Sequence, residues 1–206
     1  MSALLLSCEG VAVGGLTLPP FRLRAGESVC LHVPGPAHGE EEEQLLRVLT
    51  GGEKVPGVEV LGRVEYAAPA TGRPGLLGLF RQPYPADWLR RTAGISPGDA
   101  QRVVARLGLK PEWRVCNFSA NPRALLGLEA AWARGAEAVI FSCVGLDPLG
   151  RQAMFGAVRS RLERWAALYL SYPYLTQGHY ERDHLPGASC LEVVKPAGGA
   201  PLSLPA

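Results

Sequence analysis

The residues with the clearest capacity for chemistry form a glycine-containing loop that leads into an acidic helix. The loop runs from Gly35 to Gly39 after the apolar stretch 28–33, and four acids follow it, Glu40, Glu41, Glu42 and Glu43. A strand, a glycine-rich loop and a helix in this order are typical of a cradle for nucleotide phosphates, in which loop amides and a lysine hold the phosphate groups. Here glutamates stand where the lysine and the following Ser or Thr are expected. The sequence therefore predicts the scaffold without its cation.

The charge of this acidic run decides what the loop can bind. Two unit charges about 4 Å apart interact by roughly 4 kcal/mol at an effective dielectric constant near 20. Exchanging a lysine for a glutamate turns an attraction of that order into a repulsion, although glutamates that face solvent are screened. The alternative interpretation is structural, because acids in the first turn of a helix complement the helix dipole. Both interpretations predict poor binding of nucleotides.

Length and composition predict one globular domain. The chain has 206 residues, 47% of them hydrophobic, and a formal net charge of +2, which gives no electrostatic case for nucleic acid. No apolar run has the length of a transmembrane helix and the N-terminus has no basic export signal, so a cytoplasmic protein is expected. The cysteines lack the paired spacing of metal ligands, so we expect free thiols and no metal site at Cys8, Cys30, Cys116, Cys143 and Cys190.

The elements around the loop alternate between strands and helices, which predicts an α/β domain with a largely parallel sheet. Strands are expected at 4–8, 11–13, 28–33, 58–64, 76–80, 138–141, 167–170 and 189–194. Helices are expected at 41–50, 122–134 and 148–165, and a helical insert of about 83–117 contains shorter helical pieces at 86–91 and 99–107. The tail 197–206 is rich in Gly and Pro, so we expect it to be flexible.

One further motif follows the strand expected at 138–141. It reads Gly145-Leu146-Asp147-Pro148 and opens the long helix expected after it. Asp is a preferred N-cap residue and Pro is favoured at the first helical position, so capping alone explains this pair.

The order of these parts resembles the ATP-binding cassette family, the nucleotide-binding subunits of ABC transporters, from about Leu4 to Val194. The resemblance implies a P-loop NTPase-like ABC ATPase fold over residues 1–196, with a mostly parallel sheet, a short helical subdomain and an antiparallel edge. Gln82 matches the glutamine that ends a strand after the phosphate loop in that family. The Gly145–Pro148 motif matches the family's dimer-interface loop, and Ser119 is what remains of its Leu-Ser-Gly-Gly-Gln signature.

The catalytic positions of the family are not matched by suitable residues. The family's second nucleotide strand ends in Asp-Glu, which supplies a metal-associated acid and the general base. Aligned without a gap, these acids fall on Ile140 and Phe141, and with a two-residue deletion they fall on Ser142 and Cys143. No histidine stands near 170–173, where the family has its switch histidine.

The resemblance therefore implies a pseudo-ATPase, with no catalytic residue and no ATP, Mg²⁺ or other cofactor. Such a subunit docks on a membrane permease or an intact ABC ATPase, as a homodimer or heterodimer, and is peripheral to the inner face of the membrane through that partner. Contact with nucleic acid and direct insertion into the membrane are not expected. The expected partner contacts are Gln82, Pro83, Tyr84, Ser119, Gly145 and Asp147. The alternatives are an ABC transporter subunit that retains nucleotide binding and a soluble adaptor unrelated to transport.

Overall fold

A five-stranded parallel sheet is the centre of the fold, and it places the ends of its strands along one edge. The computed structural model describes residues 2–34, 37, 39–72, 82–172, 185 and 187–195. Every neighbouring pair in the sheet is parallel. The strand order is β10 (Ser189–Glu192), β5 (Ser28–His32), β9 (Ala166–Ser171), β8 (Ala138–Ser142) and β7 (Val64–Tyr66).

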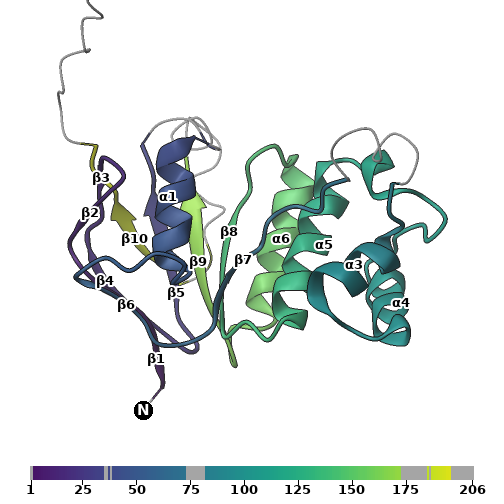
Figure 1. The fold of residues 1–206 in the computed structure, drawn as a ribbon, viewed down its shortest axis with the longest axis horizontal. Coiled ribbons are helices and arrows are strands. Elements are labelled where there is room, and N and C mark those ends of the chain that lie inside the picture. Colours follow the sequence, from purple (N-terminus) through teal and green to yellow (C-terminus); the bar gives the residue numbers. More distant parts are fainter. Residues whose placement is uncertain are drawn as a thin grey trace, which may run out of the picture.

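The central strands are apolar throughout because both faces of this sheet are covered. All six residues of β9 are buried. Their side chains alternate between two clusters, so Leu168 and Leu170 face one layer and Ala167 and Tyr169 face the other. Figure 1 shows these layers, with helix α1 (Glu40–Leu49) on one side of β8 and β9 and helices α5 (Ala120–Ala133) and α6 (Pro148–Arg159) on the other.

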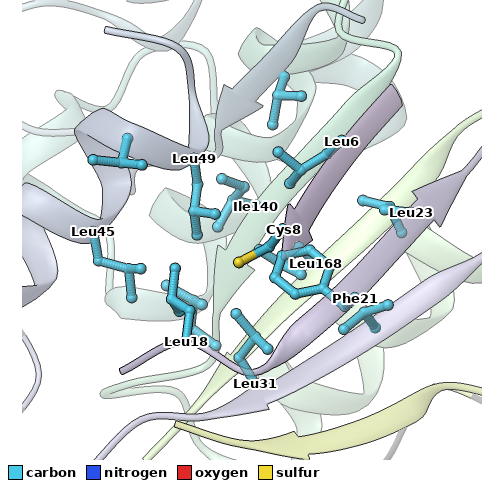
Figure 2. Close-up of a cluster of buried hydrophobic side chains, with 14 of the residues drawn as sticks. Leu6, Cys8, Leu18, Phe21, Leu23, Leu31, Leu45, Leu49, Ile140 and Leu168 are labelled. Carbon is cyan, nitrogen blue, oxygen red and sulfur yellow. The ribbon is translucent and has the colours of Figure 1, made fainter. Parts of the chain in front are cut away.

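A small antiparallel sheet closes the layer that contains α1. Its order is β4 (Pro20–Arg24), β1 (Leu4–Glu9) and β6 (Val58–Val60), and a separate hairpin joins β2 (Ala12–Val13) to β3 (Leu16–Thr17). Leu45 and Leu49 of α1 point toward Leu6 and Leu23 of this sheet and toward Ile140 of β8 (Figure 2). The expected α/β class, with a largely parallel sheet and a smaller antiparallel one, is confirmed.

The helical insert adds a separate small core beside α5. It contains α3 (Pro85–Ala93), α4 (Pro97–Arg106) and the short 3-10 helix η1 (Val115–Asn117), and α3 and α4 lie beyond α5 from the sheet (Figure 1). Leu89, Val104 and Val115 pack with Leu126 of α5 in this core. Because α5 contributes to both this core and the layer under the sheet, it fixes the insert relative to the strand ends.

A buried carboxylate of α5 strengthens that connection. Glu129 is 7% exposed. It accepts hydrogen bonds from Arg106 at the end of α4 and from Arg161 after α6, the latter at 3.0 Å. The Arg161 guanidinium also stacks on Trp132, with its carbon 3.8 Å from the ring centroid.

The structure differs from the expected elements in three places. The run 58–64 forms two strands in different sheets, because the chain bends at Leu61 and Gly62, whose amides both donate to the carbonyl of Leu5. A Cβ at Gly62 would lie 2.6 Å from Leu5 Cδ2, so a side chain there would require Leu5 to shift. β4 was not predicted, and α6 ends at Arg159 instead of Trp165 because 160–164 form turns. The strand expected at 76–80 and the tail 197–206 lie outside the described residues.

The described helices are too short or too polar to cross a lipid bilayer.

Candidate functional site

The candidate site lies where β5 leads into α1, at the carboxyl end of the parallel strands. In open α/β sheets this edge is where ligands bind. Gly39 is the N-cap residue of α1, with no side chain to cap the helix, and the four glutamates make the first turn. Gly35, Pro36 and His38 of the loop lie outside the described residues. The acidic run therefore occupies the helix terminus that a phosphate loop presents to its ligand.

Most of these acids interact with groups of the same chain. Glu41 Oε1 is 2.6 Å from Lys195 Nζ, which follows β10. Glu43 pairs with Arg47 one helical turn later at 3.7 Å. Glu42 is only 4% exposed, whereas Glu40 faces solvent. The first turn of α1 is thus anionic and is tied into the fold by its own acids.

The buried Glu42 lies near the ends of β7 and β8. Burial raises the pKa of the Tyr66 hydroxyl, and the negative charge of Glu42 is the second cause of that rise. A hydrogen bond between the Tyr66 and Ser142 side chains lowers the same pKa. Tyr66 ends β7 and Ser142 ends β8. Glu42, Tyr66 and Ser142 therefore place a carboxylate and two hydroxyls at the edge where α1 begins beside the ends of β7 and β8.

The β2–β3 turn covers the first turn of α1 from the side. A Cβ at Gly14 would lie 2.8 Å from Gln44 Oε1, and one at Gly15 would lie 3.8 Å from Glu41 Oε1. Both glycines have positive φ angles of 58° and 80°, as the tight turn requires. This turn holds no aromatic side chain that could stack on a base.

The strand ends carry no carboxylate at the positions that the resemblance singles out. Ile140, Phe141 and Cys143 are fully buried and Ser142 is half-buried. β9 ends at Ser171, and the next residue, Tyr172, is also fully buried. Two histidines further along the chain, His179 and His184, lie outside the described residues.

The Gly145–Pro148 loop meets the beginning of α5. Asp147 caps α6, because its Oδ1 accepts a hydrogen bond from the Gly150 amide at 2.8 Å. That amide, together with Asn121 of α5, holds the pKa of the Asp147 carboxyl below its usual value. The Asp147 amide also donates to Asn121 Oδ1 at 3.3 Å. The structure thus brings the expected interface residue Asp147 next to the helix whose N-cap position is Ser119, an exposed residue.

The expected contact segment 82–84 is held by the insert. The Arg114 guanidinium stacks on Tyr84, with its carbon 3.7 Å from the ring centroid, and donates to the Gln82 carbonyl at 2.7 Å. The Val115 amide donates to the Pro83 carbonyl at 2.9 Å. Pro83 is buried and Tyr84 is 36% exposed. This segment is therefore a fixed surface feature that presents one face of the tyrosine.

Comparisons with known proteins define the fold. Family models give no match, and neither do curated proteins. Among solved structures, a chain described as a metal-chelate type ABC transporter in an inward-facing conformation matches with a TM-score of 0.67 at 14% identity, over 93% of this chain and 80% of that one. A chain from Pyrococcus furiosus assigned as an ABC transporter ATP-binding protein matches with a TM-score of 0.63 at 14% identity, over 91% and 96% of the two chains.

A third solved structure also matches. The RNase-L Inhibitor matches with a TM-score of 0.58 at 18% identity, over 83% of this chain and 34% of its own length. All three identities are low, so they establish a shared architecture. The chain has the ABC ATPase fold.

Sequence reasoning missed several residues that complete these sites. Lys195 stands 154 positions from Glu41, and Arg114 stands 30 positions after Tyr84, so no local spacing links either pair. Tyr66 is likewise far along the chain from its partner Ser142, and Asn121 from its partner Asp147. A parallel sheet could have been predicted to place 64–66 beside 138–142. That prediction would have required the 58–64 run to be assigned to two separate strands.

Proposed function

We propose that this chain is a catalytically inactive, ABC ATPase-like subunit that docks on a membrane permease or on an intact ABC ATPase. It acts there as a structural or regulatory component and lies at the cytoplasmic face of the membrane through its partner. The shared fold supports the ABC ATPase-like part of this proposal. The main observation that supports the proposed inactivity is the buried carboxylate of Glu42, at the edge where Tyr66 and Ser142 end their strands.

The charges at this edge are opposite to those that phosphoryl transfer needs. That reaction depends on cations that neutralise the phosphates, on a carboxylate that holds Mg²⁺ and on a residue that orients water. Here the helix start supplies carboxylates, and the end of β8 supplies the hydroxyl of Ser142. The residues present therefore do not fit a Mg-nucleotide, and we derive no catalytic step through one.

The lysine that reaches the helix start does not reverse this balance. Lys195 is paired with Glu41 at 2.6 Å. A phosphate group at this place would compete with that carboxylate for the lysine and would also meet the charge of Glu42. Because Glu42 is buried, solvent screens its charge less than that of Glu40 or Glu43.

Two surface features support a docking role. The first is the 82–84 segment, which is anchored by Arg114 and leaves Tyr84 partly exposed. An apolar cleft of about 430 Å³ lies in the same insert and is lined by Ala86, Val104 and Leu109 among others. The second is the 145–149 loop, where Leu149 is 75% exposed at the start of α6. In the family that this chain resembles, the corresponding regions face the membrane subunit and the second ATPase.

The proposal is tested by assaying the purified full chain for ATP hydrolysis and for partners. We expect no hydrolysis above a buffer blank with Mg-ATP. We also expect a permease or an intact ABC ATPase to co-purify from native membranes and to cross-link near Tyr84 or Leu149. Hydrolysis that disappears in the Ser142→Ala or Glu42→Ala variant would contradict the inactivity. Cross-links that reach only soluble proteins would favour the adaptor unrelated to transport.

A further inference from the structure

Two cysteines and a histidine meet on the sheet face that is turned toward the layer of α5 and α6. Cys30 and His32 are two residues apart on β5, so their side chains point to the same face. Cys190 is the direct neighbour of Cys30 on β10. The two sulfur atoms and a nitrogen of the imidazole lie within 4.8 Å of one another. Among the residues that the structure describes, no other set of three or more His, Cys, Asp or Glu side chains has this arrangement.

A carboxylate stands beside this trio. Glu192 is the register partner of His32, just as Cys190 is the partner of Cys30. The four residues therefore form a block of two by two on adjacent parallel strands. Cys30 and Cys190 are hydrogen-bonded to each other, and Glu192 is close enough for its charge to act on Cys30.

The trio is open to solvent at one side. Cys30 is 1% exposed, His32 is half-buried and Cys190 is exposed. β10 is the edge strand of the parallel sheet, with β5 as its neighbour. The exposed Cys190 and the half-buried His32 therefore give an ion a route from solvent toward the buried Cys30 sulfur.

The separations suit tetrahedral zinc after a small adjustment. Zinc binds thiolate sulfur at about 2.3 Å and imidazole nitrogen at about 2.0–2.1 Å, which places tetrahedral ligand atoms roughly 3.6–3.8 Å apart. Atoms that already lie within 4.8 Å need to move inward by about 1 Å or less. Rotation of the exposed Cys190 side chain supplies such a movement. Thiolate and imidazole ligands favour zinc over Mg²⁺ or Ca²⁺, which prefer oxygen.

We propose that Cys30, His32 and Cys190 bind a zinc ion, with the Glu192 carboxylate or a water molecule as the fourth ligand. The ion joins β10 to β5 through side chains, in addition to the main-chain ladder. β10 has four residues, and three of them are exposed. Such a short edge strand buries little apolar surface, so a bound ion adds a stronger side-chain link to β5 than the Cys30–Cys190 hydrogen bond. The chain from β10 leads directly to Lys195, the partner of Glu41.

The test uses the full chain, stripped of metal with a chelator and kept reduced. Titration with Co²⁺ is expected to give one equivalent of a tetrahedral cobalt spectrum with a thiolate-to-cobalt band in the near ultraviolet. Zn²⁺ should abolish this spectrum and raise the melting temperature of the chain. Competition with a chromophoric chelator then gives the zinc affinity.

Three variants distinguish this site from other metal binding. Cys190→Ser and His32→Asn should each weaken zinc binding by about 100-fold or more, since even the loss of a group that only orients a metal ligand commonly costs about 10- to 100-fold. Cys116→Ser removes an exposed cysteine of η1 and should leave the affinity unchanged. Circular dichroism shows whether each variant folds. If only one of Cys190→Ser and His32→Asn folds, that variant is enough to test the site.

Several results would overturn the proposal. One is a wild-type chain that gives no thiolate-to-cobalt band. Another is zinc affinity that stays the same in both Cys190→Ser and His32→Asn. A third is a Cys30–Cys190 disulfide, found by alkylation and mass spectrometry in protein that was isolated with zinc in the medium. None of these outcomes depends on whether the chain hydrolyses ATP.

Discussion

Neutralising Glu42 should improve nucleotide binding far more than neutralising Glu43, although both belong to the first turn of α1. Glu42 is 4% exposed and its charge acts on Tyr66, which is hydrogen-bonded to Ser142. The side chain of Glu43 is 74% exposed and is paired with Arg47 at 3.7 Å. Glu42→Gln and Glu43→Gln are therefore a matched pair that differs mainly in burial.

The expected difference follows from screening. A buried carboxylate about 5 Å from a phosphate charge costs roughly 3 kcal/mol at an effective dielectric constant of 20. That free energy corresponds to an affinity change on the order of 100-fold. An exposed, paired carboxylate contributes about 0.5 kcal/mol or less, which is roughly twofold. Replacing all four glutamates by glutamine should add little beyond the Glu42 change.

Isothermal titration with Mg-ATP at two ionic strengths measures both quantities. We expect the wild-type chain to bind too weakly for a micromolar dissociation constant, and Glu42→Gln to bind measurably. The additional gain from neutralising Glu40 and Glu43 should shrink at high salt, whereas the Glu42 gain should persist. Melting curves of each variant confirm that the fold is intact.

Three results would refute this reasoning. Micromolar binding of Mg-ATP by the wild-type chain would show that the acids do not block the loop. Equal gains from Glu42→Gln and Glu43→Gln would show that burial does not set the magnitude. No gain even in the variant that lacks all four acids would show that loop geometry, and not charge, prevents binding.

Three further predictions concern partner contacts and stability. Tyr84→Ala should reduce co-purification of the membrane partner with little change in the melting temperature, whereas the control Leu61→Ala, at a side chain that is more exposed (60% against 36%), should change neither. Glu129→Gln should cost roughly 2 kcal/mol of stability in denaturant unfolding, because it weakens charge-assisted hydrogen bonds to two partly exposed arginines; Glu59→Gln on an exposed strand position should cost almost nothing, and equal losses would contradict this. Asp147→Asn should lower the melting temperature at neutral pH. Because the pKa of Asp147 is depressed in the fold, this difference should persist above about pH 4 and vanish as the pH falls through the lower folded value; a constant difference would contradict capping by the charged form.

Much of the fold could be predicted because the apolar runs were continuous and separated by clear turns. β5, β8 and β9 are buried on both faces, so their sequences read as unbroken apolar stretches that no exposed element shares. The errors fell where local pattern is ambiguous. The 58–64 stretch alternates as one strand would, and only the packing of Gly62 against Leu5 reveals the bend.

The site was harder to predict because its contacts are long-range. The reversal of charge at 40–43 is visible in the sequence, but the different surroundings of the four glutamates are not. Helical spacing links Glu43 to Arg47, whereas nothing local links Glu41 to Lys195 or Cys30 to Cys190. The last two contacts depend on β10 returning to the side of β5, and that pairing is a property of the whole sheet.

The two interpretations of the acidic run are physically coupled. In a phosphate loop the bound anion satisfies the positive end of the helix dipole, and here carboxylates in the same turn do so. Removing them to improve phosphate binding therefore also removes about 0.3–1 kcal/mol of helix stabilisation for each acid near the terminus. A Glu42→Lys change adds one cation but leaves β8 ending in Ser142, followed by Cys143, without the carboxylate that Mg²⁺ needs. If the proposed inactivity holds, ATP hydrolysis would require changes on at least two elements, α1 and β8, and a change on α1 alone would destabilise the helix start before it provided any catalysis.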